Sequence, residues 1–539
     1  MENQRTLLYI TFFFLLFLIW QAWQQDYGPK PVAVVESGTT AQNGMPAIND
    51  TPTAVALPDS VPQARMVEAV RQPVHVVTDN MDLYIDTRGG TIYRLDLRHY
   101  PQDADNKDIP FALFSDKESQ LHIAQSGLIS SASPAPNHHA IYHAQQTEYR
   151  LAEGVDELSV ELFWQEADVR VKKRFIFKRN SYVIEVQHQV QSASDWSGSQ
   201  YQQLSRADTD TRGESTFIYT YTGGVIYNDD LKYEKVNFSD MADKDLGLEM
   251  KGGWIAMIQH YFLAAWIPDQ TQTGFTYSKH PSSNRYLLGT RSPLTSVAAG
   301  EQANFSSKLV VGPKLQYELA EVSPGLDLTV DYGVLTILAK PLFWILKQYH
   351  TLFDNWGWAI IFLTITVKLI FYKLSEASYK SMAKMRKVAP KLTSLKERYG
   401  DDRQGMSQAM MKLYKEEKIN PLGGCLPILV QMPVFIALYW VLLESVEMRN
   451  APFALWITNL SAQDPYYILP LIMGATMFIQ QKLNPAPMDP MQQKIFQIMP
   501  VMFTVFFLFF PAGLVLYWVV NNTLSIIQQW VITKRIAAS

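Results

Sequence analysis

The chain has 539 residues, of which 47% are hydrophobic and only 18% are charged, and its formal net charge is −4. Average soluble proteins carry roughly 25% charged residues, and the missing charge here is concentrated in a few long apolar runs. The composition excludes a disordered chain, a collagen-like chain and a chain that is basic throughout in order to bind DNA. The one cysteine, Cys425, excludes an intrachain disulfide.

Six apolar runs predict membrane-spanning helices. Crossing the hydrocarbon core takes about 20 apolar residues, and three of the runs have about that length. The runs that begin at residues 356, 466 and 495 are shorter and also fit buried soluble helices, but the clustering of five runs in the last third favours membrane spans. The six runs cover residues 6–23, 356–372, 422–443, 466–480, 495–510 and 514–532.

Residues 1–23 are predicted to form a signal-anchor helix that stays in the mature protein. A cleaved signal peptide is the alternative, but Trp20 and Trp23 follow the apolar centre, where a cleavage site needs small residues. Tryptophans commonly anchor helices at membrane interfaces. Residues 24–65 hold six prolines and one aromatic residue, which predicts a flexible linker without a core of its own.

Residues 66–325 are predicted to form a large antiparallel β-sandwich. Apolar and polar residues alternate over residues 93–97, 169–178 and 182–190, which is typical of half-buried strands. Gly223 and Gly224 lie at the centre of a stretch, 217–227, that we interpret as a hairpin. Because few helical patterns intervene, the strands favour a sandwich over an α/β fold.

No motif in this block indicates chemistry. The spacing of His138, His139 and His143 is compatible with a metal site, but their Ser, Pro and Asn neighbours favour a solvated loop. The sequence contains no HExxH, GxSxG or P-loop pattern. We therefore expect neither a cofactor nor a catalytic site.

Residues 326–350 repeat leucine at intervals of three and four, which predicts an amphipathic helix bent at Pro341. Because this segment directly precedes an apolar run, we expect it to lie on the outer surface of a membrane.

The distribution of basic residues predicts the topology. The segment from Lys373 to Lys418 contains 12 Lys or Arg and 6 Asp or Glu, and short basic loops stay in the cytoplasm. The loop at 444–465 is then external, and the loop near 482–494 is internal. Lys534 and Arg535 place the C-terminus inside. By the same count, residues 24–350 lie outside and Met1 lies inside.

One cation, Lys368, lies within an apolar run. Its position one turn from the end of the run fits a side chain that extends to the interface, whereas neighbouring polar residues favour a wet cavity. Thr364 lies one turn earlier, Gln431 lies in the third run, and Asn522 and Ser525 share a face of the last run with Trp518, beside Asn521. Gln431 and the asparagines alone would equally serve as hydrogen-bonding links between helices. No Asp or Glu lies mid-run to relay protons.

The basic segment, residues 373–420, is predicted to be a helical hairpin that turns at residues 400–402. Met385 belongs to an apolar stripe on the first helix, and Met406 and Met410 form a shorter stripe on the second. Such methionines either accept varied apolar segments or pack on the other helix. Lys384 and Arg386 contribute to a charge that favours contact with lipid headgroups or ribosomal RNA.

Several motifs make the chain resemble the YidC/Oxa family of membrane protein insertases in its Gram-negative form, over nearly the whole length. They are SMAKMR (381–386), NPLGGC (420–425), QMP (431–433), FALW (453–456), LSAQDPYY (460–467), DPMQQK (489–494), FPAGLVLY (510–517) and QHYFLAAW (259–266). The resemblance implies a multi-pass inner-membrane protein with six transmembrane helices and a periplasmic β-supersandwich. It also implies a five-helix core over 351–539 with a groove that is open to cytoplasm and lipid but closed outside.

In this family the groove carries a cation, often arginine, and the matching position is Lys368. The resemblance also implies that Thr364, Gln431, Trp518, Asn521 and Asn522 line the groove, with Trp518 where some members have tyrosine. Client segments slide along the third and fifth spans of the family. The matching positions here are Pro427, Met432, Pro433, Phe435, Phe503, Phe506 and Phe507.

The resemblance therefore implies an insertase and membrane chaperone, not an enzyme, that acts on newly made membrane proteins alone or with the Sec translocon. Independently of the resemblance, we expect a monomer, and the charge of the basic hairpin favours contact with the ribosome. Two other functions remain open at this point: a channel or transporter, and a membrane-tethered periplasmic sugar-binding protein.

Overall fold

The computed structural model describes residues 73–103, 106–209, 220–282, 284–400, 402–417, 426–484 and 490–538. These residues divide into a β unit that ends at Val330 and a helical unit that begins at Asp331. The predicted signal anchor at 1–23 and the linker at 24–65 lie outside the described residues, as do NPLGGC and Asp489.

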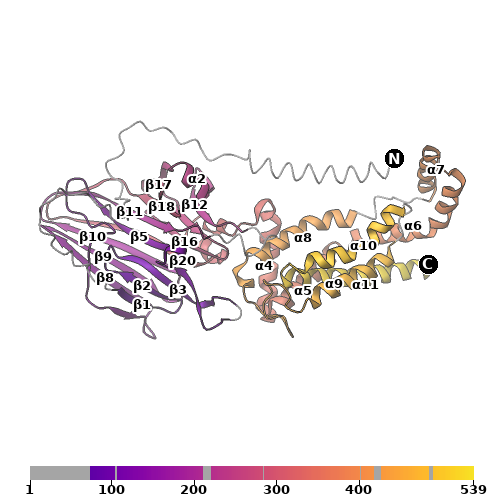
Figure 1. Ribbon diagram of the computed structural model, residues 1–539, viewed down its shortest axis with the longest axis horizontal. Helices are drawn as coiled ribbons and strands as arrows, with labels where there is room; N and C mark the ends of the chain where they lie inside the picture. Colours follow the sequence, from indigo (N-terminus) through magenta and orange to yellow (C-terminus); the bar gives the residue numbers. More distant parts are fainter. Residues whose placement is uncertain are drawn as a thin grey trace, which may run out of the picture. The chain divides into compact units, whose positions relative to one another are not determined.

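The β unit contains two large sheets, coloured indigo to magenta in Figure 1, and all their strand pairs are antiparallel except that of β1 with β7. The first sheet has the order β14 (Gly247–Lys251), β17 (Thr273–Ser282), β18 (Arg285–Arg291), β11 (Trp196–Arg206), β5 (His122–Ile129), β3 (Thr91–Pro101), β2 (Met81–Asp86), β1 (Pro73–Val77) and β7 (Glu148–Arg150), with β19 (Thr295–Val297) on β11 and β4 (Pro110–Phe114) on β3. The second has the order β13 (Lys232–Val236), β12 (Gly223–Asn228), β15 (Trp254–Ile258), β16 (Phe262–Ile267), β20 (Gln302–Pro313), β10 (Val183–Ser192), β9 (Val169–Lys178), β8 (Glu157–Glu166) and β6 (His143–Ala144).

The two sheets pack face to face. The indole nitrogen of Trp266 on β16 donates to the backbone oxygen of Gln203 on β11, at 3.2 Å. On β9 the alternation in the sequence matches the burial, because Val169, Val171 and Phe175 are all buried. The structure thus shows a sandwich whose strands at 169–178 and 183–192 follow the predicted pattern.

The prediction of a hairpin centred on Gly223 and Gly224 is wrong. Both glycines lie inside strand β12, where Gly223 pairs with Ile258 and Gly224 pairs with Met257. A Cβ on Gly224 would come within 2.4 Å of the Met241 methyl group on helix α2 (Phe238–Asp243). The glycines therefore serve close packing, and the chain turns after Asn228 instead, between β12 and β13.

The three histidines considered as metal ligands are not grouped. His138 is buried and its Nδ1 lies 2.6 Å from the Tyr201 hydroxyl, whereas His143 is exposed on β6. No group of three His, Cys, Asp or Glu side chains among the described residues is arranged to hold a metal ion.

The segment expected to be one helix over 326–350 is divided. Residues Leu326–Thr329 form the 3-10 turn η3, Gly333–Leu335 form the 3-10 turn η4, and helix α4 begins only at Thr336 and continues to Phe353. Gly333 has a positive φ of 59°, which interrupts a regular helix. Leu326 belongs to the core of the β unit, beside helix α3 (Gln316–Val322).

The helical unit contains the five apolar runs predicted in the last third. Figure 1 shows α5, α9 and α11 running alongside one another, and each of α5 and α9 packs against α11. The remaining helices are α5 (Trp356–Ile370), α6 (Tyr372–Tyr399), α7 (Arg403–Glu416), α8 (Leu426–Glu444), α9 (Ile468–Leu483), α10 (Pro490–Phe507) and α11 (Ala512–Ala538), with the 3-10 turn η6 (Val446–Met448).

Among the described residues, no single helix has both the length and the hydropathy of a membrane span. Helix α5 and the first part of α6, up to Val388, meet both conditions only as a pair, across a bend of 67°. Three shorter apolar helices cover Val430–Glu444, Ile468–Leu483 and Gln493–Phe507.

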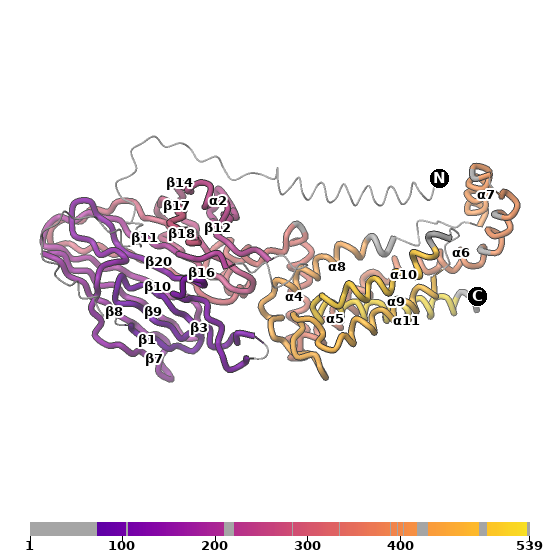
Figure 2. Tube along the Cα trace, viewed as in Figure 1, coloured from indigo at the N-terminus to yellow at the C-terminus, as the bar shows by residue number. Residues whose placement is uncertain are grey.

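Helices α6 and α7 form a hairpin, visible at the far right of Figure 2. Val388 and Leu392 are buried, and Met385, Met410 and Leu413 pack against them. The apolar stripes of the two helices therefore pack against each other. Of the two roles that the sequence left open for the methionines, this is packing on the other helix.

Asp464 organises the loop between α8 and α9. Its side chain is buried and accepts hydrogen bonds from the Trp456 indole nitrogen at 3.0 Å, the Tyr466 backbone at 3.0 Å and the Leu469 backbone at 2.7 Å. These bonds tie the first turn of α9 to the FALW segment.

We expect Asp464→Ala to destabilise the protein by about 2 kcal/mol, because three donors lose their acceptor and the Leu469 backbone donor among them is buried. Thermal unfolding followed by tryptophan fluorescence in detergent measures this. Asp464→Asn, which keeps one acceptor oxygen, should have a midpoint between those of wild type and alanine. An unchanged midpoint in Asp464→Ala would show that the loop does not depend on this carboxylate.

Candidate functional site

A cluster of polar side chains lies inside the helical unit around Lys368, near the end of α5. The Lys368 ammonium donates to the hydroxyl of Ser525 on α11 at 2.8 Å and to Oε1 of Gln431 on α8 at 3.5 Å. The lysine side chain thus extends toward two other helices, and its two acceptors come from parts of the chain 63 and 157 residues away.

Further hydrogen bonds connect these acceptors. Gln431 Nε2 donates to Asn521 Oδ1 at 2.6 Å, and the Ser525 hydroxyl donates to the backbone oxygen of Asn521 at 2.7 Å. Asn521 and Ser525 are one helical turn apart on α11, and both are buried. Lys368, Ser525, Asn521 and Gln431 therefore form one connected group, which we call the polar cluster.

The polar cluster leaves the charge of Lys368 without an opposite charge. Ser525 and Gln431 are neutral, and no carboxylate of the described residues lies within ion-pair distance of the Lys368 ammonium. Neutral acceptors satisfy N–H donors but leave a net positive charge, so the cluster attracts anions.

Two other predicted groove residues lie outside this hydrogen-bonded group. Thr364 is buried, and its hydroxyl donates to the backbone oxygen of Ile360 in its own helix. Asn522 donates instead to the hydroxyl of Thr476 on α9, at 3.4 Å. Thr476 was not predicted from the sequence, since a threonine inside an apolar run most often bonds to its own helix, as this one also does through Met473.

Trp518 connects the polar cluster to an aromatic group. Its ring centroid lies 4.9 Å from that of Phe435 on α8 and 5.8 Å from that of Phe507 on α10. The indole Nε1 is buried and has no hydrogen-bond acceptor among the described residues. The ring thus joins three helices, one turn before Asn521 and Asn522.

Comparisons with known proteins agree with one another. Residues 348–539 match the family model of the 60Kd inner membrane protein, and residues 73–345 match that of the YidC periplasmic domain. The membrane protein insertase YidC of Thioalkalivibrio sulfidiphilus is 53% identical over 99% of both chains. That of Methylococcus capsulatus is 51% identical, again over 99% of both chains. The chain belongs to the YidC family of membrane protein insertases.

Family membership gives the chain an inner-membrane location and an all-β sandwich domain followed by a helical region. A crystal structure of an active YidC insertase with its first transmembrane domain resolved matches 85% of this chain and 92% of its own, with 20% identity and a TM-score of 0.39. The sequence matches to the family extend over almost the full length of the chain.

The predicted client-slide residues of this YidC-family chain differ in exposure. Met432 and Phe506 are each 43% exposed, and Pro433 is exposed as well, whereas Phe507 is only 4% exposed. Phe435 and Phe503 are half-buried, and Phe503 lies 6.2 Å from Phe507 between ring centroids. Pro427 lies within α8, and its side chain is outside the described part. Phe507 therefore packs inside the unit, and Met432, Pro433 and Phe506 present apolar surface.

The predicted hairpin residues divide between packing and surface. Lys384 is exposed, and Arg386 donates to the backbone oxygen of Lys482 at the end of α9, at 2.7 Å. Met406 is half-buried on α7. Arg386 thus links the hairpin to the rest of the helical unit. Lys384 is exposed on the surface of the hairpin.

Proposed function

We propose that this chain inserts integral membrane proteins by receiving a short polar tail of the client at the polar cluster. The observation that carries the proposal is the Lys368 ammonium, held by neutral side chains from α8 and α11. A client tail with an acidic residue supplies the missing opposite charge. The proposal assigns no chemical step to the chain.

The attraction between the Lys368 ammonium and a client carboxylate is comparable to the cost of placing a cation in the membrane. A lysine at the centre of a membrane helix costs about 2.5–3.5 kcal/mol on insertion scales, and this is an upper bound for Lys368, which lies in the last turn of α5. Two unit charges 4 Å apart attract by about 4 kcal/mol at an effective dielectric constant of 20. A carboxylate in the client tail thereby recovers an energy similar to the cost of placing the lysine there.

After the tail has entered, the apolar segment of the client moves into lipid along α8 and α10. Exposed apolar side chains on α10, including Ile498, Val501 and Met502, support this route. Burial of apolar surface supplies roughly 25 cal/mol per Å², which drives the segment out of the site without nucleotide hydrolysis.

We infer a topology of six spans, with residues 24–350 in the periplasm and both termini in the cytoplasm. The net basic charge between Lys373 and Lys418 supports the cytoplasmic placement of the α6–α7 hairpin. The exposed cations of that hairpin, such as Lys384, favour contact with ribosomal RNA. We also infer a monomer that works alone or beside the Sec translocon.

Insertion by the purified protein tests the proposed function. Liposomes containing the full chain receive a single-span client with an acidic tail, and protection of the tail from added protease is measured. We expect protection with the protein and none in empty liposomes. A release assay with an entrapped dye in the same liposomes addresses the channel alternative, which predicts solute flux without a client.

Ser525 should position the Lys368 ammonium. We expect Ser525→Ala to lower insertion of the acidic-tail client about five- to thirtyfold, because loss of one charged hydrogen bond costs roughly 1–2 kcal/mol. Ser525→Thr keeps the hydroxyl and should restore most of the activity. A client with a neutral tail should insert equally into wild type and Ser525→Ala; an equal loss for both clients would point to a structural role only.

A further inference from the structure

The loop between α8 and α9 has an unusual distribution of charge. Residues 450–467 carry a single charged side chain, that of Asp464, and it is buried. About four charged residues would be expected in a segment of this length with average composition, and connecting segments usually lie in water. The surface of the 450–467 loop is therefore uncharged, which distinguishes it from the basic hairpin of α6 and α7.

Large apolar and aromatic side chains lie on the outside of this loop. Leu455 is 89% exposed, and Tyr466 and Tyr467 are 65% and 47% exposed. Leu455 also has a positive φ of 56°, a conformation that glycine and asparagine adopt far more readily than leucine does. A leucine that is both exposed and strained contributes little to folding. Its side chain therefore indicates a contact that the helical unit itself does not supply.

Hydrogen bonds hold Leu455 at the tip of a fixed turn. The Phe453 backbone nitrogen donates to the Ile457 oxygen at 2.9 Å, which closes the turn around Leu455. The Phe453 oxygen accepts from the side chain of Asn355, the residue before α5, also at 2.9 Å. The turn is thus attached to the beginning of α5, and the position of Leu455 is fixed relative to that helix.

The loop continues an exposed apolar face of α9. Five apolar residues of this helix are exposed at intervals that place them on one side of it: Leu471, Ile472, Ala475, Phe478 and Ile479. Tyr467 lies one helical turn before the first of them. In a protein of the inner membrane, an exposed apolar face of this kind contacts lipid. Tyrosines are enriched where such a helix leaves the hydrocarbon core, because the ring is apolar and the hydroxyl is polar.

We propose that the 450–467 loop is embedded in lipid at this end of the helical unit, with Leu455 among the acyl chains and both tyrosine rings at the headgroups. In the topology inferred above, this is the outer leaflet. Exposed charge would oppose such a position, and the loop has none. Because the turn is fixed to α5 and the loop leads into α9, it holds the beginnings of both helices at one depth. Such an anchor requires the six-span topology but not the polar cluster.

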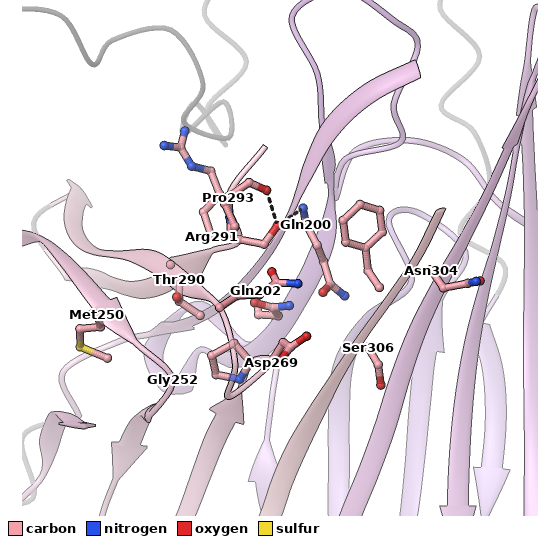
Figure 3. Close-up of a pocket in the computed structure, with 15 residues that line it drawn as sticks. Gln200, Gln202, Met250, Gly252, Asp269, Thr290, Arg291, Pro293, Asn304 and Ser306 are labelled. Atoms are coloured by element: carbon pink, nitrogen blue, oxygen red, sulfur yellow. Dashed lines mark hydrogen bonds between the residues drawn. The ribbon is translucent and has the colours of Figure 1, made fainter. Parts of the chain in front are cut away.

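Fluorescence quenching of the full chain in liposomes tests this lipid contact. Cys425→Ser removes the native cysteine, and bimane then labels one new cysteine at a time, in Leu455→Cys, Ala475→Cys or Ser306→Cys. Ala475, near the middle of the exposed face of α9, is the lipid control. Ser306 is the water control, because it is exposed on β20 at a pocket lined largely by amide and hydroxyl side chains (Figure 3).

The two kinds of quencher report lipid and water separately. We expect lipids with a nitroxide on the acyl chain to quench the Leu455→Cys and Ala475→Cys labels at least about twofold more than the Ser306→Cys label, because these nitroxides lie in the hydrocarbon core. Aqueous iodide should give the opposite order.

Three results would overturn the proposal. If iodide alone quenches the Leu455→Cys label while lipid quenches the Ala475→Cys label, the loop lies in water and the topology stands. If neither quencher reaches the Leu455→Cys label, a protein surface covers the loop instead of lipid. If lipid fails to quench the Ala475→Cys label, the topology and the anchor are both wrong. Client insertion, measured in the same liposomes, tests the proposed function on its own.

Leu455→Gly separates the lipid contact from folding. Glycine adopts the positive φ without strain, which offsets the greater freedom of the unfolded chain, so the variant should unfold in detergent at about the wild-type temperature. In liposomes, iodide should quench a label on the exposed Thr458→Cys about twofold more in Leu455→Gly, because the loop loses its apolar contact with the acyl chains. Leu294→Gly, at an exposed leucine of the β unit, is the matched control and should leave this label unchanged. Unchanged quenching in a stable Leu455→Gly variant would show that Leu455 does not anchor the loop.

Discussion

Lys368→Ala is expected to reduce insertion of an acidic-tail client at least about tenfold. The alanine variant loses the only charge in the polar cluster, whose Ser525 and Gln431 acceptors are neutral. A factor of ten corresponds to about 1.4 kcal/mol, which is well below the roughly 4 kcal/mol that a close charge pair can supply in this setting. Protease protection of the client tail in liposomes measures the loss.

Two comparisons make this result specific. Lys368→Arg keeps the positive charge and should retain most of the insertion, although the planar guanidinium donates in a different geometry. A client whose tail lacks acidic residues should insert into Lys368→Ala nearly as well as into wild type. If Lys368→Ala still inserts the acidic-tail client, the charge of Lys368 is not needed for insertion. Lys368 would then be a side chain that only extends toward the membrane interface.

The sequence predicted Lys368 because a cation inside an apolar run stands out by its cost. Its actual neighbours were harder to predict. Helical spacing favours Thr364 and Asn522 as neighbours of Lys368, yet Thr364 bonds to its own backbone and Asn522 bonds to Thr476 on another helix. Ser525 was visible only as a residue on the same face of α11. Which polar residues meet depends on how the helices rotate against each other, and the period of one helix does not contain that information.

In the β-sandwich, too, some features can be predicted from the sequence and others cannot. Strands β9 and β10 were predictable because alternation over ten residues has a local cause, the two faces of a strand. The glycines of β12 suggest a turn in the sequence, but Gly224 is needed because Met241, on a helix that follows β13, packs against it. Long-range packing of this kind leaves no periodic pattern. Lys173 likewise fits the alternation of β9, but the alternation does not predict its backbone acceptors at Gly89 and Ser126.

Lys173→Met is expected to destabilise the β unit by about 2–4 kcal/mol. The Lys173 ammonium is fully buried between the sheets and donates to the backbone oxygens of Gly89 and Ser126, both at 2.8 Å, and of Gly90 at 3.3 Å. Methionine fills a similar volume but leaves these oxygens without a donor, and each such loss costs about 1–3 kcal/mol. Regained apolar packing offsets part of this cost. Urea unfolding followed by tryptophan fluorescence measures the difference.

Lys172→Met provides the matched control on the opposite face of β9. Lys172 is partly exposed and lies 3.5 Å from Glu161, and such surface pairs contribute at most about 1 kcal/mol. Equal effects of the two substitutions would show that the Lys173 hydrogen bonds do not hold the sheets together.

The Lys173 amine should also give the unfolding free energy a distinctive pH dependence. Burial lowers the pKa of Lys173 from 10.5 to about 7. Between these two values the unfolded chain binds the proton and the folded chain does not, so stability rises with pH across this window. Below pH 7 both states are protonated, and the folded protein bears the full cost of a buried charge. The wild-type free energy should therefore increase from pH 7 to pH 10 relative to that of Lys173→Met, which has no titrating group there. If the two curves stay parallel, the three backbone oxygens keep the amine charged in the folded protein, and Lys173 is a fixed cation that joins the sheets rather than a titrating one.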